Sequence, residues 1–258
     1  MRIEDIDPPR EQPGAAGLII DALARYGFAW DGAISYQSDS LDAHLEAISA
    51  LHSSGLTYRC GCSRRDLADA PRGPLGIIYP GTCRNRSQTQ EAAIRVRTSN
   101  VAVEFEDGLQ GYQVQQLEAE SGDFVIQRRD GLIAYQLAVV VDDHIQGVSE
   151  VVRGIDLLPS TPRQIWLQSL LGYPRPRYRH IPVAVDNSGE KLSKSSGALP
   201  LTTADVSNTL FAALESLRQQ PPPELASAPV PVIWDWAIEH WNADALRGIR
   251  QINANPAS

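Results

Sequence analysis

The feature that most restricts the fold of this chain is a long apolar run that ends in two acidic residues. The run reads IAYQLAVVVDD and covers residues 133–143. A segment that is apolar along its length is typical of a parallel β-strand covered by helices on both faces. The run therefore predicts an α/β protein, and 258 residues are enough for one large domain or two small ones.

Segments with helical and strand periodicity surround this run. Helices are predicted where apolar residues repeat at helical spacing before a glycine, at residues 18–26, 42–54 and 161–171. In the second of these helices, the apolar stripe is expected to contain Leu41, Leu45, Ile48 and Leu51. Alternating residues predict strands at 92–98, 101–107 and 123–131, and HIPVAV (180–185) predicts another. Two C-terminal helices, at 206–220 and 232–241, are expected on either side of a proline-rich linker.

The composition excludes several classes of protein. A net charge of −8 argues against a protein that attracts nucleic acid as a whole, so such a partner would need a local basic patch. One candidate patch is RPRYRH (175–180), which could equally be the solvated entry to a strand. There is no run of 18 apolar residues and no apolar core of a signal peptide at the N-terminus. Together with an odd number of cysteines, three, this predicts a soluble cytoplasmic protein without a disulfide framework.

The only two lysines of the chain lie three residues apart in a Ser/Gly-rich loop. The loop reads SGEKLSKSSG (188–197) and contains Lys191 and Lys194, whereas the other 21 cationic side chains are arginines. Lysine is a flexible point charge that binds phosphate, and ligands of open α/β sheets lie beyond the carboxyl ends of strands. The loop, which follows the strand expected at 180–185, therefore indicates a polyphosphate site. The alternative is a solvated surface turn.

All three cysteines lie within 24 residues of one another. Cys60 and Cys62 form the motif CGC, and Cys83 ends the motif YPGTC. In a reducing compartment such a cluster favours a metal site over a disulfide, although buried free thiols remain the alternative. Structural zinc takes four ligands. His52 is a possible fourth ligand by type, but its helix is expected to turn it outward.

Several motifs in order resemble one known family. EKLSKSSG (190–197) is similar to the KMSKS-type loop of class I aminoacyl-tRNA synthetases, which holds the phosphates of ATP. Three further segments resemble the glutamate-specific branch: RIEDIDPPR (2–10), RRDGLIAYQLAVVVDDH (128–144) and EVVRGIDLL (150–158). With CGC…YPGTC, they are most similar to the glutamyl-Q-tRNA(Asp) synthetases, short relatives of glutamyl-tRNA synthetase without an anticodon-binding domain. The resemblance covers residues 1–200.

The resemblance implies a fold and a division into domains. It implies a Rossmann-like catalytic domain at 1–58 and 131–200, an inserted zinc-bearing α/β subdomain at 59–130 that binds the acceptor end of an RNA, and a helical C-terminal segment at 201–258. The sheet of such a domain is doubly wound, with the strand order 3-2-1-4-5. Asp142 and Asp143 are expected at the end of a strand, where site residues gather, and could alternatively be turn residues.

The resemblance also implies roles for individual residues. Glu4 would receive the ammonium group of L-glutamate, and Tyr135 and Arg153 would complete the pocket, with Arg153 offering a charge-assisted fork to a carboxylate. Lys194 would contact ATP, which is used with Mg²⁺, and Lys191 would lie beside it. One structural Zn²⁺ would be held by Cys60, Cys62, Tyr79 and Cys83. Taken singly, Glu4 could be an exposed acid, Tyr135 a core aromatic residue, and Arg153 a helix cap or the partner of Glu150.

The activity implied is ATP-dependent activation of glutamate as an adenylate and its transfer to the queuosine base of tRNA(Asp), by a ligase expected to be a monomer. The family begins with a strand–loop–helix unit that contains R-F-A-P-S-P-S-G and binds ATP, and this unit would precede Met1. We therefore expect a longer natural protein or a degenerate remnant, and no activity from these 258 residues without an N-terminal extension. The alternatives are a truncated glutamyl-tRNA synthetase and a non-catalytic RNA- or zinc-binding module.

Overall fold

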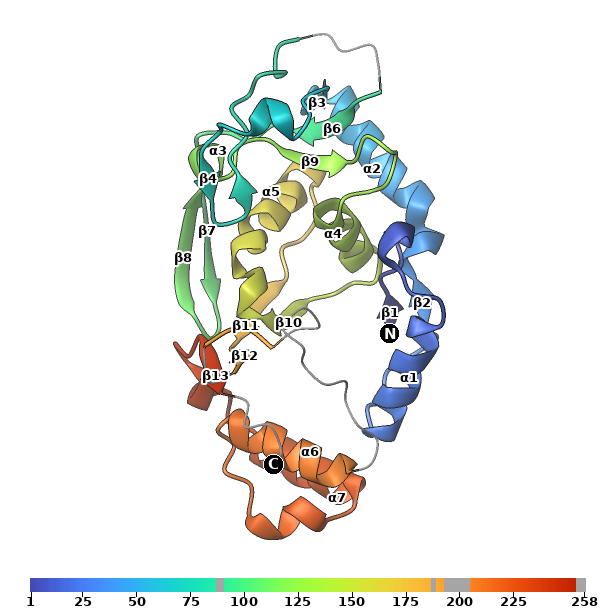
Figure 1. Cartoon of the computed structure of the whole chain (residues 1–258), viewed down its shortest axis with the longest axis vertical. Coiled ribbons are helices and arrows are strands. Elements are labelled where there is room, and N and C mark those ends of the chain that lie inside the picture. Colours follow the sequence, from blue (N-terminus) through green and yellow to red (C-terminus); the bar gives the residue numbers. More distant parts are fainter. Residues whose placement is uncertain (87–90, 187–188, 193–204, 254–258) are drawn as a thin grey trace.

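The computed structural model describes residues 1–86, 91–186, 189–192 and 205–253, which form a mixed α/β protein (Figure 1). The helices are α1 (Ala15–Arg25), α2 (Leu41–Ser53), α3 (Leu117–Glu120), α4 (Tyr135–Ile145), α5 (Thr161–Leu171), α6 (Val206–Ser216) and α7 (Val230–His240). None of the helices described is long and apolar enough to cross a membrane.

The strands form small sheets of both kinds. The N-terminal strands are β1 (Arg2–Ile3), β2 (Ser35–Tyr36), β3 (Thr57–Cys60), β4 (Arg72–Gly73), β5 (Gly76–Ile77), β6 (Ala93–Val96), β7 (Ala102–Asp107), β8 (Gly111–Gln116) and β9 (Phe124–Gln127). The later ones are β10 (Glu150–Gly154), β11 (Arg177–Ile181), β12 (Val183–Val185) and β13 (Gln251–Asn253). The four-stranded sheet has the order β10-β11-β7-β8, in which β10, β11 and β7 are parallel and β8 is antiparallel.

The parallel strands therefore fall into separate groups, and the expected order 3-2-1-4-5 is not the order found among the described residues. β1 pairs in parallel with β2 in a sheet of their own, and β12 pairs in parallel with β13. β3, β6 and β9 form an antiparallel sheet. In the four-stranded sheet, the register of β10 and β11 aligns Arg153 with His180.

The prediction of a strand at residues 133–143 is wrong, because this segment forms helix α4. Six consecutive residues of α4 are buried, Leu137 to Asp142, and the first five are apolar. The helix packs between α2 and α5, so apolar residues are required all round it. A short apolar run cannot distinguish a helix buried on every side from a buried strand, and here the packing outweighs the strand preference of valine.

The other predicted helices are found, with one difference in the buried face. In α2, Ile48 and Leu51 are buried as expected, but Leu41 and Leu45 are 47% and 41% exposed. His44 and Ala47 are buried instead. His44 can be buried because it pairs with Asp142, a buried acid on α4. Helix α5 ends as predicted at Gly172, which adopts a φ of 70°.

The predicted strands at 92–98, 101–107 and 123–131 correspond to β6, β7 and β9. The predicted strand at 180–185 is split between β11 and β12. The main core lies among α2, α4, α5 and the β3-β6-β9 sheet, and a second core lies where α5 meets β7 and β11. Helices α6 and α7 form a third cluster with Tyr26, at the end of the molecule away from β3 and β6 (Figure 1).

Candidate active site and metal-binding cluster

A groove of about 1110 Å³ connects the start of α4 to the cysteine segment. Glu4 and Tyr135 line one part of it, and Cys60 and Cys62 line another. Five arginines also line it: Arg10, Arg64, Arg95, Arg128 and Arg129. Four acids line it as well, Glu4, Asp7, Glu91 and Asp130, and Asp7 pairs with Arg10 and Arg128, so charges of both signs meet in the groove.

Tyr135 is the first residue of α4, and its side chain lies near the charged residues Arg153, Glu4 and Asp143. Burial raises the pKa of Tyr135, and the positive charge of Arg153 opposes this rise. Tyr135 is 36% exposed and lines the groove, so it is not a core aromatic residue. The structure thus brings together the three residues predicted for the glutamate pocket.

Glu4 is held by its neighbours although it is exposed. Arg2 forms ion pairs with Glu4 at 3.2 Å and with Asp143 at 2.8 Å. Burial raises the pKa of Asp143, and the charge of Arg2 opposes that rise. The order of these charges, acid–arginine–acid, fixes the start of the chain beside α4.

Arg153 lies in β10, and hydrogen bonds fix its guanidinium group. Nη2 donates to Thr161 Oγ1 at 2.8 Å and to Gln164 Oε1 at 2.7 Å. Nε donates to His180 Nε2 at 3.1 Å. These three hydrogen bonds use Nε and Nη2, and none of them uses Nη1. The Nε and Nη2 groups of the guanidinium, which were expected to be available to a carboxylate, are thus already hydrogen-bonded within the protein. Glu150, the alternative partner predicted for it, instead pairs with Arg177 and Arg179.

The two acids predicted at a strand end lie on α4. Asp142 is buried and accepts hydrogen bonds from Gln37 Nε2 at 2.6 Å and from His44 Nε2 at 2.8 Å. Burial opposes its ionisation, but these hydrogen bonds lower the pKa of Asp142. Asp142 therefore ties α2 to α4, whereas Asp143 faces Arg2.

The lysine loop follows β12 as predicted, and only its first part is described. Lys191 forms a β-bridge with Val185, and its Nζ lies 2.6 Å from Asp156 Oδ2. Asp156 is three residues beyond Arg153, so the loop starts near the carboxyl end of β10. Lys194 lies outside the described residues.

The three cysteines converge as a metal-binding cluster requires. Their sulfur atoms all lie within 4.8 Å of one another, and Cys62 and Cys83 are 3.5 Å apart. The Tyr79 hydroxyl lies 3.4 Å from Cys60 Sγ and 3.7 Å from Cys62 Sγ. Three soft thiolates with one phenol oxygen suit zinc, and the geometry fits the predicted set. His52 is exposed, as expected, and bonds to Thr57 Oγ1.

Hydrogen bonds within the cluster favour one thiolate. Burial opposes ionisation of Cys83, but hydrogen bonds with Tyr79 and with the Gly61 N–H lower its pKa to about 7. Burial raises the pKa of Cys62 to about 11. Arg129, just before α4, donates to the Gly61 carbonyl at 2.8 Å, which ties the cysteine loop to the segment that leads to Tyr135.

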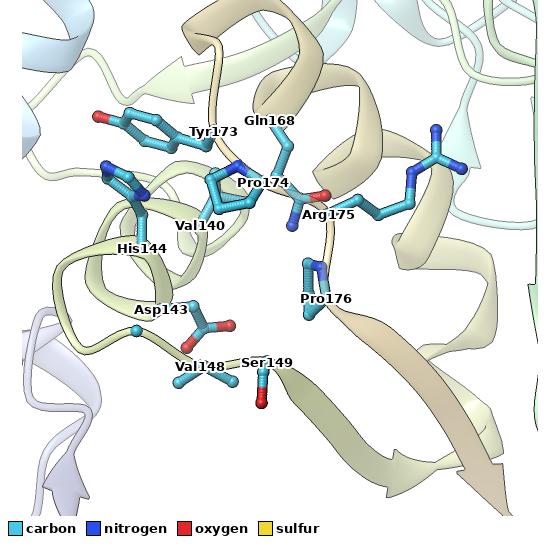
Figure 2. A pocket seen from close by; sticks show the side chains of 11 residues that line it. Val140, Asp143, His144, Val148, Ser149, Gln168, Tyr173, Pro174, Arg175 and Pro176 are labelled. Carbon is cyan, nitrogen blue, oxygen red and sulfur yellow. The ribbon is translucent and has the colours of Figure 1, made fainter.

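A second cavity, of about 190 Å³, lies between the end of α4, the start of β10 and the segment after α5 (Figure 2). His144 stacks on Tyr173 beside it, with ring centroids 3.7 Å apart. Asp143 also borders this cavity, whereas Glu4 and Tyr135 line the groove, and Arg153 is among the lining residues of neither. The groove, not this cavity, is therefore the candidate active site.

Sequence reasoning missed the residues that support the site. Asp107 and His180 pair behind Arg153, and Asp123 binds Arg84 beside Cys83. The available signal was weak: an acid at the end of a strand and a histidine at the start of HIPVAV. Their partners are 73 and 39 positions away in the chain, so no local pattern connects them.

Comparison with known proteins agrees with this fold and site. Residues 1–214 match the family described as tRNA synthetases class I (E and Q), catalytic domain. The chain belongs to this family of ligases and has its catalytic fold, with mixed sheets.

Proteins named glutamyl-Q tRNA(Asp) synthetase are close relatives of the chain. The one from Pseudomonas fluorescens is 50% identical over 94% of this chain and 80% of its own length. The one from Aromatoleum aromaticum is 49% identical over 94% of this chain and 78% of its own length.

Two glutamate–tRNA ligase structures share the fold. Those from Elizabethkingia meningosepticum and Elizabethkingia anophelis match with TM-scores of 0.75 and 0.76, each at 19% identity over 98% of this chain. The chain spans 60% and 61% of their lengths.

Proposed function

We propose that this protein activates L-glutamate with ATP as glutamyl-adenylate and transfers the glutamyl group to the queuosine base of tRNA(Asp). The observation that carries the proposal is that Glu4 and Tyr135 line one part of an arginine-lined groove, with the charge of Arg153 close to Tyr135. An acid and an arginine separated by a tyrosine match the ammonium and carboxylate groups of an amino acid. The names of the relatives support the same acceptor.

In this proposal, Glu4 receives the ammonium group of glutamate and the Nη1 edge of Arg153 receives a carboxylate. A carboxylate oxygen of glutamate attacks the α-phosphorus of ATP, and pyrophosphate leaves. A nucleophile of the RNA then attacks the carbonyl carbon, and AMP leaves. Lys191 and Lys194 neutralise the phosphates together with Mg²⁺, so catalysis rests on positioning and charge.

We also propose one structural Zn²⁺ per chain, held by Cys60, Cys62, Tyr79 and Cys83. When bound, the metal supplies a covalent clamp between two loops of the segment 59–130. That segment is proposed as an insertion that meets the RNA, between catalytic parts 1–58 and 131–200 and before the helical segment 201–258. The hydrogen bond from Arg129 to the Gly61 carbonyl joins the cysteine loop to the segment that leads to Tyr135.

The basic patch at 175–180 does not favour the alternative of a non-catalytic RNA-binding module. Arg177 and Arg179 pair with Glu150, and Arg175 donates to the Glu104 carbonyl. Glu150 therefore offsets one of the three positive charges of this patch. We propose the arginines of the groove as the phosphate-binding residues, although Arg10 and Arg128 also pair with Asp7.

Two measurements test the proposal. Glutamate-dependent exchange of pyrophosphate into ATP is measured on the 258-residue chain and on the same chain preceded by a strand–loop–helix unit with R-F-A-P-S-P-S-G. Absence of exchange from both would contradict glutamate activation. Charging is then compared on tRNA(Asp) with and without queuosine and on tRNA(Glu). Charging of tRNA(Glu) would instead indicate an ordinary glutamyl-tRNA synthetase.

A further inference from the structure

Behind the candidate glutamate pocket lies a fully buried histidine–aspartate pair. His180 of β11 and Asp107 of β7 are 0% and 1% exposed. Asp107 Oδ2 lies 2.6 Å from His180 Nδ1, and its Oδ1 accepts the backbone N–H groups of Leu109 and Gln110 at 3.0 and 2.9 Å. Burial opposes ionisation of Asp107, but its hydrogen bonds with His180 and these N–H groups lower its pKa. Asp107 is therefore a carboxylate that only accepts hydrogen bonds.

The partner of Asp107 determines which histidine nitrogen carries the proton. A carboxylate cannot donate, so His180 Nδ1 is the donor. The other nitrogen, Nε2, lies 3.1 Å from Arg153 Nε and 3.2 Å from Thr161 Oγ1. A guanidinium has five N–H donors and no acceptor, so Nε2 is the acceptor in this contact. His180 is thus neutral, with its proton on the side of Asp107.

His180 is one of three acceptors that hold Arg153. Thr161 and Gln164 accept from Nη2, and His180 accepts from Nε. These three bonds do not use Nη1, on a side chain that is only partly buried, and Arg153 also interacts with the Tyr135 hydroxyl beside it. The three acceptors come from β11 and α5, so the orientation of Arg153 depends on tertiary packing.

We propose that His180, held by Asp107, is a positioning residue that aims the Nη1 edge of Arg153 at a carboxylate of the substrate glutamate. The inference rests on the proposed function, because it takes Arg153 as the carboxylate-binding residue. His180 does not touch the substrate. It acts by occupying Nε, which excludes rotamers of Arg153 that would present the Nε–Nη2 edge to the ligand.

The chain contains a matched control for this role. His44 is also 0% exposed and pairs with a buried acid, Asp142, at 2.8 Å. Its hydrogen bond joins α2 to α4, and no hydrogen bond joins it to Arg153 within the described ranges. Removing His44 should therefore disturb a buried pair of the same kind without releasing Arg153.

The test uses two substitutions of His180 that separate its bond to Asp107 from the contacts of Nε2 with Arg153 and Thr161. His180→Asn retains a donor for Asp107 but has no acceptor at the Nε2 position. His180→Gln can bring an amide oxygen close to the Nε2 position. We expect His180→Asn to weaken glutamate binding, measured by titration calorimetry, by about tenfold, as for loss of one well-placed hydrogen bond. We expect His180→Gln to restore most of the affinity, and His44→Asn to leave it unchanged.

In the N-terminally extended chain, KM for glutamate should rise in His180→Asn while KM for ATP stays constant. In an Arg153→Lys background, His180→Asn should add no further loss, because its effect passes through Arg153. Equal losses in His180→Asn, His180→Gln and His44→Asn would overturn the inference, since a general packing effect would then explain them.

A measurement on the unsubstituted protein decides the hydrogen-bond pattern independently of glutamate. Nitrogen-15 NMR of the histidine ring should find His180 with a protonated Nδ1 and an unprotonated Nε2. A proton on Nε2 would overturn the inference. If the unsubstituted protein binds no glutamate, the proposed function fails, while the ring nitrogens and the Arg153 Nε–H signal still report whether His180 holds Arg153.

Discussion

The carboxylate of Asp123 is predicted to be the main polar support of the cysteine segment, and Asp123→Asn tests this. Asp123 is 2% exposed. It accepts hydrogen bonds from Arg84 at 2.7 and 2.8 Å and from the backbone N–H of Thr98 at 2.7 Å. Tyr58 donates its hydroxyl to the same carboxylate. Arg84 directly follows Cys83, so the network fixes one metal-ligating residue from behind.

The loss of unfolding free energy expected in Asp123→Asn follows from the burial of this carboxylate. Breaking a buried ion pair by neutralising one partner typically costs 3–5 kcal/mol. Arg84 is 28% exposed and keeps Glu118 and the Thr98 carbonyl as partners, so we expect the lower end, about 3 kcal/mol. Glu118 provides the matched control, because it pairs with the same arginine at 2.7 Å but is 39% exposed. Glu118→Gln should cost less than about 1 kcal/mol.

The assay is urea unfolding followed by circular dichroism. With a slope of about 1–3 kcal/mol per molar urea, Asp123→Asn should lower the midpoint by about 1 M or more. The variant should also retain less zinc after dialysis than Glu118→Gln. If the two variants lose the same free energy of unfolding, the buried carboxylate does not support this segment and the reasoning is refuted.

Three further predictions follow from the site. Elemental analysis of protein purified without added metal should find one zinc per chain, and Tyr79→Phe should reduce it; three freely titrating thiols in the folded protein would contradict the site. Lys194→Ala in the extended chain should slow pyrophosphate exchange by about 10²–10³ with little change in glutamate affinity, whereas an unchanged rate would make the loop a surface turn. The pKa values of Asp107, Asp123 and Asp142 are lowered in the folded state, so their stabilising effect is complete above the ordinary carboxyl pKa of about 3.9 and is lost as pH falls below it. Unfolding free energy measured by urea titration should therefore fall steeply below about pH 4, and less steeply in Asp123→Asn.

Local sequence was sufficient for features that depend on neighbouring residues. The end of α5 at Gly172 and the alternating strands β6, β7 and β9 follow from spacing and from helix-termination signals. The order of short motifs was sufficient for the family. The clustering of Cys60, Cys62 and Cys83 also agreed with the predicted set, because their spacing is short.

Tertiary structure decided what depends on residues distant in the chain. The run 133–143 is apolar in either conformation, and only its packing between α2 and α5 makes it the helix α4. Asp107 and His180 are ordinary residues until the pairing of β7 with β11 brings them together. A buried charge requires a partner, and a sequence alone does not say which distant residue supplies it. For this reason the direction of the Arg153 guanidinium was determined only by the folded chain.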